Sequence, residues 1–425
     1  MTRVEVSPVS LRGRIAAPAS KSYTHRALLA GYLSGRPYHV HHPNDCEDTR
    51  ATRDGLQAMG ARVELRRNGW TVHRDPRAAN PRDSPTVDCH ASGTTLRFLA
   101  ALAAGGRNDT RFIGEARLSR RPIRELLELL QGAGARVRMG RPGRSLPFHL
   151  RGPIRGGSYE LDASVSSQFV SALLFVLPTL QEPSVLRLRN SLVSAPYVDA
   201  TVAVLTSHGV RLGREPERFV VPAPQSFEGR QFFVTGDASS AAYLWAAAAV
   251  TGGSVTVTGI DPKWPQADLR MLDLLEQMGA RVSRHSRALT VRGPLRRGVE
   301  VDLTDAPDLY PLVGVLAALA PEGSSLLRGA PQVSVKESDR RKTTVALLRD
   351  LGARVRSREG ALEVLPGRSP LRLDLQGLTD HRLLMSAAVG ALGLRGRSRL
   401  APAEAAAKSF PGFFEALRSL GAEVD

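Results

Sequence analysis

The chain has 425 residues, 42% of them hydrophobic, and its 58 basic residues outnumber 41 acidic ones to give a net charge of +17. This length exceeds what one hydrophobic core usually supports, so two domains are expected. The start, MTRVEVSPVS, lacks the apolar run of a signal peptide, and no stretch is apolar enough to span a membrane, which favours a cytoplasmic protein without a membrane partner. The two cysteines, Cys46 and Cys89, predict neither a disulfide framework nor a metal site.

The positive charge is compatible with two kinds of partner: a nucleic acid, or small polyanions bound within a generally basic chain. Basic residues are spread along the whole sequence, and only 5% of residues are aromatic, so platforms for stacking nucleobases are scarce. These features favour small anionic molecules over nucleic acid. Lysine is rare, because only five of the 58 basic residues are lysine: Lys21, Lys263, Lys336, Lys342 and Lys408.

A nine-residue pattern centred on a glycine recurs six times along the chain. The copies are GLQAMGARV, LLQGAGARV, VLTSHGVRL, LLEQMGARV, LLRDLGARV and ALRSLGAEV. Their glycines, called the landmark glycines below, are Gly60, Gly134, Gly209, Gly279, Gly352 and Gly421, so successive gaps are 74, 75, 70, 73 and 69 residues. Six repeats of this size fill the chain.

Each repeat also carries an earlier segment in which a strand leads through small polar residues into an apolar helix. In chain order these segments are GRIAAPASKSYTHRALLAGYL, TVDCHASGTTLRFLAALAA, SYELDASVSSQFVSALLFVL, QFFVTGDASSAAYLWAAAAV, VEVDLTDAPDLYPLVGVLAAL and LRLDLQGLTDHRLLMSAAVGAL. Helices that are apolar all round are buried, and each of these begins with Ser, Thr, Asp or Pro-Asp. The helices that end at the landmark glycines are amphipathic, as in RPIRELLELLQGAGA, and short alternating strands follow them.

The repeat is therefore a βαβαββ-type unit, and the fold class is α/β. The last copy stops at GAEVD, whereas residues 2–17 supply strand material ahead of the first buried helix, so the two termini are expected to complete one another. This predicts one discontinuous lobe of residues 1–19 and 235–425 and a second lobe of residues 20–234, with three repeats in each.

The starts of the six buried helices suggest chemistry. Helix N-termini leave N–H groups uncapped and carry a partial positive charge, so three from each lobe facing one cleft would attract anions there. For a single Ser, Thr or Asp, an ordinary helix cap is the better explanation. Basic residues near helix starts oppose the dipole unless an anion is present, and they are Lys21, Arg26, Lys336, Arg382 and Lys408.

Other candidates have plainer alternatives. Glu337 and Asp339 beside Lys336 and Arg340 would, without context, be an exposed run of ion pairs. A lone His25 or His381 is more often structural than catalytic. The sequence contains no Walker loop, dinucleotide fingerprint or cluster of metal ligands, so neither a metal nor a cofactor is expected.

Taken together, ten motifs resemble the 5-enolpyruvylshikimate-3-phosphate synthase family, over nearly the full length and in the right order. They are PASKSYTHRALL, ASGTTLRFL, RRPI, SVSSQF, SAPYVD, GDASSAA, APD, VKESDR, DHRLLM and AKSFPGFF. The resemblance implies a two-lobed inside-out α/β barrel and a monomer. It also implies transfer of the enolpyruvyl group of phosphoenolpyruvate to the 5-hydroxyl of shikimate 3-phosphate, with release of phosphate, on the pathway to chorismate and aromatic amino acids.

The resemblance also implies roles for individual residues. Asp308 would be the base and Glu337 the proton donor, with Lys21 also catalytic. The residues implied for shikimate 3-phosphate are Lys21, Ser22, Arg26, Ser166, Ser167, Gln168, Ser194, Tyr197, Asp308, Gln332 and Lys336. Those implied for phosphoenolpyruvate are Lys21, Gly93, Thr94, Arg121, Gln168, Arg340, His381, Arg382 and Lys408.

Three residues depart from common family patterns: Gln332 and Ala91 each stand where asparagine is frequent, and Phe98 stands where some relatives have proline. Two alternatives remain open at this point. The sister UDP-N-acetylglucosamine enolpyruvyl transferases typically carry a reactive cysteine in a loop that corresponds to RFIGEARLSRR here, which has none. A basic nucleic-acid-binding protein is the alternative from another class.

Overall fold

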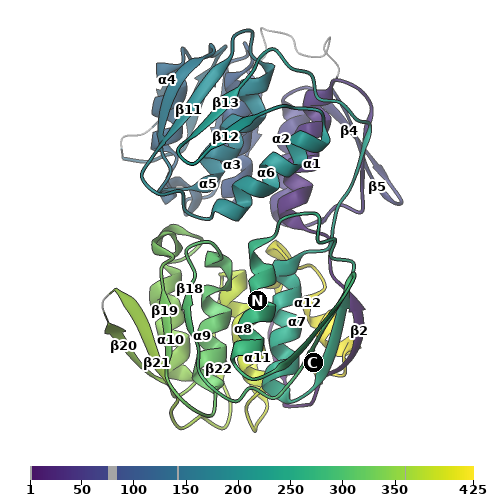
Figure 1. The fold of residues 1–425 in the computed structure, drawn as a ribbon, viewed down its shortest axis with the longest axis vertical. Helices are drawn as coiled ribbons and strands as arrows, with labels where there is room; N and C mark the ends of the chain where they lie inside the picture. The colour runs from purple at the N-terminus through teal and green to yellow at the C-terminus, as the bar shows by residue number, and fades with distance from the viewer. Residues whose placement is uncertain (1, 75–83, 141–142, 359) are drawn as a thin grey trace. The chain divides into compact units, whose positions relative to one another are not determined.

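The computed structural model describes residues 2–74, 84–140, 143–358 and 360–425. The chain divides into two compact units, of which unit 1 comprises Met1–Pro18 and Thr235–Asp425, and unit 2 comprises Ala19–Val234. Figure 1 shows helices and small sheets within each unit. In the described residues, no helix combines the length and the apolar character needed to cross a membrane.

Unit 2 contains three repeats of alternating strands and helices. Its α-helices are α1 (Lys21–Ser34), α2 (Glu47–Ala58), α3 (Gly93–Ala104), α4 (Arg124–Gly132), α5 (Ser167–Val176) and α6 (Ala195–Ser207), and its 3₁₀ helices are η1 (Leu118–Arg120) and η2 (Leu177–Thr179). Its strands are β3 (Tyr38–His41), β4 (Ala61–Arg66), β5 (Gly69–Arg74), β6 (Thr86–Asp88), β7 (Thr110–Ile113), β8 (Arg136–Met139), β9 (Phe148–Arg151), β10 (Gly157–Asp162), β11 (Ser184–Arg189), β12 (Gly213–Glu215), β13 (Arg218–Val221) and β14 (Gln231–Phe233).

Unit 1 contains the other three repeats and both termini. Its α-helices are α7 (Ala238–Thr251), α8 (Arg270–Gln277), α9 (Tyr310–Leu319), α10 (Arg340–Asp350), α11 (His381–Leu392) and α12 (Phe413–Ser419), and its 3₁₀ helices are η3 (Ala267–Leu269), η4 (Pro307–Leu309), η5 (Pro331–Val335) and η6 (Ala403–Lys408). Its strands are β1 (Val4–Val6), β2 (Arg12–Ala16), β15 (Ser254–Thr258), β16 (Arg281–His285), β17 (Ala288–Arg292), β18 (Glu300–Asp302), β19 (Ser325–Arg328), β20 (Arg354–Arg358), β21 (Ala361–Leu365), β22 (Asp374–Leu375) and β23 (Ser398–Leu400).

The predicted α/β repeat is confirmed by the sheets. In β6-β7-β9-β8, the first two strands are parallel and the last two form an antiparallel hairpin. The same order recurs in β10-β11-β13-β12 and β18-β19-β21-β20. The first strands of the first and fourth repeats are exchanged, because β2 pairs with β15 in unit 1 and β14 pairs with β3 in unit 2. This exchange is why unit 1 is discontinuous in sequence.

The two termini complete one sheet, as the truncated last repeat predicted. Strand β1 pairs antiparallel with β23, and β22 pairs parallel with β23. An isolated bridge joins Val6 to Val424. The N-terminal strand and the C-terminal residues thus stand where the other repeats have their hairpin.

The landmark glycines end the outer helices by adopting the left-handed conformation. All six have a positive φ, from +76° at Gly209 to +111° at Gly134. Residues with a Cβ are disfavoured in that region, whereas glycine enters it readily. This requirement at the end of each outer helix explains why the sequence repeats the same glycine six times.

The six buried helices also lie where the sequence predicted them. In α11 all twelve residues are buried, and in α3 all but Thr94 are. The expectation that their N-termini are uncapped is wrong for four of them. A side-chain oxygen of the N-cap residue accepts a backbone N–H in each of these, and the four residues are Ser92, Ser166, Asp237 and Asp380.

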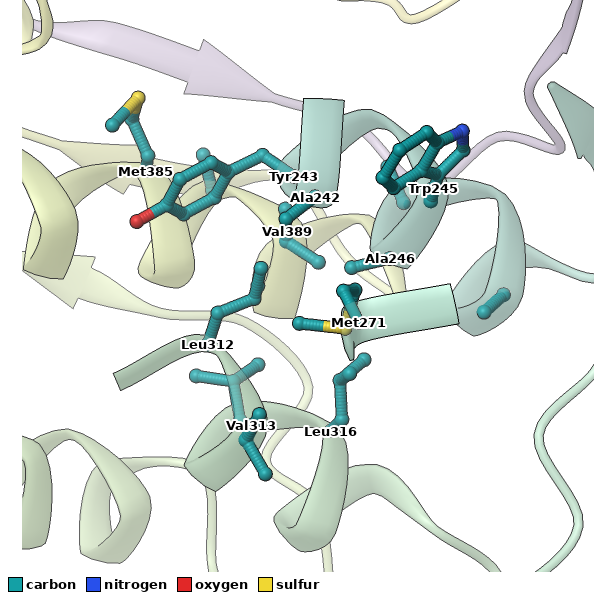
Figure 2. Packing of buried hydrophobic residues seen from close by; sticks show 14 of the residues in the cluster. Ala242, Tyr243, Trp245, Ala246, Met271, Leu312, Val313, Leu316, Met385 and Val389 are labelled. Atoms are coloured by element: carbon teal, nitrogen blue, oxygen red, sulfur yellow. The ribbon is translucent and has the colours of Figure 1, made fainter. Parts of the chain in front are cut away.

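The core of unit 1 forms where α7, α9 and α11 pack against one another. Figure 2 shows Ala246 of α7 near Met271 and Val389 of neighbouring helices, whereas the Trp245 ring points away from them. The same cluster includes Leu312, Val313, Leu316 and Met385. The indole N–H of Trp245 donates to the Leu289 carbonyl at 3.2 Å, so the largest buried side chain leaves no polar group unsatisfied.

The landmark glycines give a stability prediction. At Gly421 an added Cβ would meet nothing within 4 Å, so Gly421→Ala should lose only the backbone strain of a positive φ, about 1–2 kcal/mol. At Gly352 the Cβ would lie 2.1 Å from the Arg368 carbonyl oxygen, so Gly352→Ala should lose clearly more free energy of unfolding. Urea denaturation of both variants measures this difference, and equal losses would contradict it.

Candidate functional site

Arg26 is a buried cation of unit 2. Its guanidinium donates to the Ser22 carbonyl at 2.8 Å, the Tyr197 carbonyl at 2.7 Å and Thr201 Oγ1 at 2.9 Å. It also lies over the Phe98 ring, 5.6 Å from the centroid. Burial lowers the pKa of Arg26 to about 10, which leaves it charged at neutral pH. Since its described contacts are all to neutral groups, this charge remains available to an anion.

Lys21 is the first residue of α1, and an acid that the sequence analysis did not single out holds it. Its ammonium donates to Asp48 Oδ2 at 2.8 Å, and both side chains are largely buried. Asp48 stands in the first turn of α2, where a carboxylate also complements the helix dipole. The ion pair fixes the Lys21 ammonium between the starts of α1 and α2.

Gly93 is the first residue of α3, and the Arg121 guanidinium lies directly against it. A Cβ at position 93 would be 2.7 Å from Arg121 Cζ and 2.8 and 2.9 Å from its two terminal nitrogens. Any side chain here would therefore displace the guanidinium. The Arg121 guanidinium can occupy this position only because residue 93 has no side chain.

Gln168 joins the starts of α3 and α5. Its Oε1 accepts from Arg97 Nη1 at 2.5 Å, and its Nε2 donates to Thr94 Oγ1 at 3.0 Å. Two serines precede it, the N-cap Ser166 and the largely buried Ser167. Hydroxyls, an amide and backbone N–H groups at a helix start are suited to binding a phosphate or carboxylate.

Ser194 and Tyr197 stand at the start of α6. Ser194 is its N-cap and has φ +56°, a left-handed conformation that is uncommon outside glycine. The Ser194 carbonyl accepts the Tyr197 N–H at 3.1 Å, and the Tyr197 carbonyl accepts from Arg26. The predicted residues Ser22, Arg26 and Tyr197 are therefore joined by short contacts from α1 to α6.

Unit 1 brings acids and bases together in one buried group, called the acid–base cluster below. It consists of Asp308, Lys336, Glu337, Arg340, Asp380 and Arg382. At its centre the Arg340 guanidinium, 1% exposed, donates to Asp308 at 2.8 Å, to Glu337 at 2.6 Å and to Asp380 at 2.9 Å. Arg382 donates to the other Asp308 oxygen at 2.7 Å, and Lys336 Nζ lies 3.9 Å from Asp308.

Electrostatics in this cluster fix its protonation. Burial alone would raise the pKa of Asp308, but Arg382, Lys336 and Arg340 together hold it far below its ordinary value. Burial would lower the pKa of Arg340, but the Asp380, Glu337 and Asp308 carboxylates outweigh burial and raise it. Asp308 is therefore ionised at neutral pH, which a proton acceptor must be.

Asp268 is a neighbouring carboxyl that the sequence did not signal. It lies in η3, is 2% exposed, and accepts a hydrogen bond from Ser239 Oγ at the start of α7. Burial and the Asp308 charge raise the pKa of Asp268 to about 7, while Arg382 acts in the opposite direction. Nothing but its position inside the fold distinguishes it from an ordinary helix-start acid.

Two expectations need correction. Lys408 does not lie at a helix start: it is the last residue of η6 and is largely buried. The exposed ion-pair explanation is wrong for Glu337 and Arg340, which are buried in the acid–base cluster. It fits only the neighbouring contact of Asp339 with Lys342, which is 3.5 Å long with the lysine side chain 86% exposed.

The other predicted residues of unit 1 are also buried. Gln332 lies in η5 and donates from Nε2 to the Thr304 carbonyl at 2.8 Å. His381, 1% exposed, is the first residue of α11, beside its N-cap Asp380. Asp380 was overlooked as a partner of Arg340, although it stands in the DHR motif. In the part of the chain that the structure describes, no three His, Cys, Asp or Glu side chains are grouped to hold a metal ion.

The sequence matches one protein family over nearly its full length. A family model described as EPSP synthase (3-phosphoshikimate 1-carboxyvinyltransferase) matches residues 6–417. A 3-phosphoshikimate 1-carboxyvinyltransferase of Halobacterium salinarum is 40% identical over 430 residues, covering 99% of this chain and 99% of that protein. One of Methanocorpusculum labreanum is 36% identical over 419 residues, covering 99% and 98%.

Solved structures agree at the level of fold. An EPSP synthase from Acinetobacter baumannii has a TM-score of 0.82 at 24% identity and covers 100% of this chain and 99% of that chain. The enolpyruvyl transferase NikO from Streptomyces tendae has a TM-score of 0.79 at 21% identity, covering 100% and 98%. These likenesses confirm the predicted two-lobed enolpyruvyl transferase-like fold. Since the family model and the full-length relatives agree with the motifs, the chain belongs to the EPSP synthase family.

Proposed function

We propose that the residues described above carry out the transfer of the 1-carboxyvinyl group of phosphoenolpyruvate to the 5-hydroxyl of shikimate 3-phosphate, with release of phosphate. The observation that carries the proposal is the Asp308 carboxylate, which Arg340 and Arg382 hold from both sides and keep ionised. The chain is a transferase of the shikimate pathway by family membership. The roles of its residues are the proposal.

Shikimate 3-phosphate suits the helix starts of unit 2. Ser166 and Ser167 at α5 and Ser194 at α6 would hold its phosphate, because hydroxyls and N–H groups at the start of a helix are suited to binding an anion. Ser22 and Arg26 would hold its carboxylate, since the Arg26 contacts leave its charge uncompensated. The remaining residues proposed for this substrate are Lys21, Gln168, Tyr197, Asp308, Gln332 and Lys336.

Phosphoenolpyruvate carries a phosphate and a carboxylate, which cationic side chains would bind. In unit 2, the Arg121 guanidinium at Gly93 and the Lys21 ammonium are candidates for these anions. The full set proposed is Lys21, Gly93, Thr94, Arg121, Gln168, Arg340, His381, Arg382 and Lys408. These cations would also stabilise the charge that develops during phosphate loss.

The proton transfers must balance over two steps. In the first step, addition, a proton reaches the methylene carbon of phosphoenolpyruvate, the 5-hydroxyl oxygen bonds to C2, and the hydroxyl proton passes to a base. In elimination, the C2–O bond to phosphate breaks, the new methyl group loses a proton, and the carbon–carbon double bond forms again. We assign the base to Asp308 and the proton donor to Glu337, with Lys21 as a further participant in proton transfer.

To act as the proton donor, Glu337 must carry a proton when phosphoenolpyruvate is bound. Its Oε2 accepts from Arg340 at 2.6 Å, and a guanidinium this close favours the ionised carboxylate, which has no proton to donate. A substrate anion that binds Arg340 competes with Glu337 for the guanidinium. Binding of phosphoenolpyruvate would thereby favour the protonated form of Glu337 at the stage when the proton is needed.

Phosphate release tests the proposed function. Purified protein supplied with shikimate 3-phosphate and phosphoenolpyruvate should release phosphate and form an enolpyruvyl ether, detectable by mass spectrometry. Either substrate alone should give no phosphate above background. Absence of phosphate with both substrates present would refute the function.

The acid–base assignments predict the effect of two isosteric variants. Asp308→Asn and Glu337→Gln keep the size of the side chain but remove the titrating group, so turnover should fall by about a hundredfold or more while both substrates still bind. Steady-state kinetics and calorimetric titration separate these quantities. Near-normal turnover in either variant would remove that residue from the proton transfers.

The lysines give a prediction with internal controls. The side chains of Lys21, Lys336 and Lys408 are mostly buried, which leaves little room for a larger group. A guanidinium is broader than an ammonium and does not release a proton near neutral pH. Lys21→Arg, Lys336→Arg and Lys408→Arg should therefore reduce phosphate release severely without a matching loss of melting temperature.

The controls are Lys263→Arg and Lys342→Arg. The Lys342 side chain is 86% exposed, and Lys263 lies over the Trp264 ring at 5.2 Å, a contact that arginine can also make. Both variants should keep normal activity. Equal behaviour of all five variants would show that the placement of lysine is accidental.

A further inference from the structure

A buried chain of side-chain hydrogen bonds, called the threonine chain below, crosses three helices of unit 2. His25 Nδ1 of α1 lies 2.7 Å from Thr52 Oγ1 of α2, which lies 2.7 Å from Thr95 Oγ1 of α3. Thr95 Oγ1 in turn lies 2.7 Å from Ser92 Oγ, the N-cap of α3, and 3.1 Å from the Asp48 carbonyl of α2. All of these side chains are buried, and His25, Thr52 and Thr95 have no part in the proposed chemistry.

The hydrogen bonds of the threonine chain have a preferred donor-to-acceptor direction, from His25 toward Ser92. Burial lowers the pKa of His25 to about 3, so the imidazole is neutral and carries one proton. His25 Nε2 is buried without a hydrogen-bond partner, and an unsatisfied acceptor is tolerated better there than an unsatisfied N–H. The proton therefore belongs on Nδ1, which donates to Thr52. Thr52 then donates to Thr95, and Thr95 donates to Ser92 or to the Asp48 carbonyl.

The helices approach closely enough for these bonds because of one glycine. Gly55 lies one turn after Thr52 in α2, and a Cβ at Gly55 would be 2.4 Å from Leu99 Cδ1 and 3.1 Å from Val87 Cγ1. Leu99 lies one turn after Thr95 in α3. The missing side chain at Gly55 thus lets the two threonine hydroxyls meet.

The Thr95 end of the threonine chain reaches residues proposed to bind phosphoenolpyruvate. Asp48, whose backbone carbonyl contacts Thr95, holds the Lys21 ammonium with its carboxylate at 2.8 Å. Ser92 immediately precedes Gly93 and Thr94, where Arg121 and Gln168 make their contacts. We propose that His25, Thr52 and Thr95 are positioning residues, which fix the first turn of α3 relative to Lys21 and so set the geometry for phosphoenolpyruvate.

Hydrogen bonds fix this geometry in a way that apolar packing does not. Apolar side chains at these positions would bury similar area but tolerate sliding of one helix along another, whereas each hydroxyl needs its partner within about 3 Å. A displacement of about 1 Å at a substrate-positioning group can reduce the rate by up to about a hundredfold. The inference rests on the proposed phosphoenolpyruvate site.

Isosteric threonine-to-valine variants test the inference. Thr52→Val and Thr95→Val remove one hydroxyl and keep the shape, and the Ser92 cap on the residue 95 N–H is retained in both. The KM for phosphoenolpyruvate should rise about tenfold or more, while the KM for shikimate 3-phosphate changes less than about threefold. The control is Thr344→Val in unit 1, which removes a fully buried hydroxyl without a partner and should leave both KM values unchanged.

Substitution of His25 gives a rescue test. Asparagine places an N–H close to the Nδ1 position of histidine, so His25→Asn should keep a KM for phosphoenolpyruvate near the wild-type value. His25→Leu removes the donor and should behave like Thr52→Val. Loss of function in both His25 variants to the same extent would contradict the role of the Nδ1 hydrogen bond.

Hydrogen exchange provides a readout that does not need activity. A peptide covering residues 92–96 should exchange faster in Thr52→Val than in wild type or Thr344→Val. Unchanged exchange and unchanged KM values, or a fall in melting temperature with both KM values unchanged, would refute the inference. If the wild-type protein releases no phosphate, the proposed function fails. The hydrogen-exchange experiment still decides whether the threonine chain orders the first turn of α3.

Discussion

The buried guanidinium of Arg340 is the interaction on which the rest of the acid–base cluster depends. A charge that is 1% exposed is tolerated only with close partners, and Asp308, Glu337 and Asp380 supply them from three different elements. Removing one partner of a buried ion pair typically costs about 3–5 kcal/mol, so these acids are constrained by stability as well as by chemistry. The same arrangement keeps Asp308 ionised. The contacts that stabilise Arg340 are therefore also contacts that hold the proposed base in its charged form.

The two units use the same kind of helix start for opposite purposes. In unit 2 the side-chain caps of α3 and α5 are the neutral serines Ser92 and Ser166, so the partial positive charge there remains available to a bound anion. In unit 1 the caps of α7 and α11 are Asp237 and Asp380, so a protein carboxylate already occupies each helix start. The Asp380 carboxylate also forms an ion pair with Arg340. One repeated fold thus carries neutral caps at α3 and α5 of unit 2 and acidic caps at α7 and α11 of unit 1.

Most of the fold could be predicted from the sequence because it depends on local rules. A landmark glycine is needed wherever an outer helix ends in a left-handed residue, and an all-apolar helix must be buried, so both recur in recognisable form. The site was less predictable where residues distant in sequence meet. Asp48 as the partner of Lys21 and Asp380 as the partner of Arg340 depend on helix packing, which no local pattern encodes. Lys408 was misplaced because a 3₁₀ helix leaves no apolar periodicity to predict it.

Repetition explains how such a site can be built from one unit. The residues that all six repeats share, the landmark glycines and the apolar helix bodies, determine backbone geometry and therefore cannot vary freely. The first residue or two of each buried helix contribute little to that geometry, because a cap needs only an oxygen atom that serine, threonine and aspartate all provide. In α1, α3 and α11 these positions carry Lys21, Gly93 and Arg382, which differ in chemistry while the helices keep the same place in the repeat. The hydrogen bonds of the threonine chain likewise depend on side chains at positions where the helices face one another, in this case α1, α2 and α3.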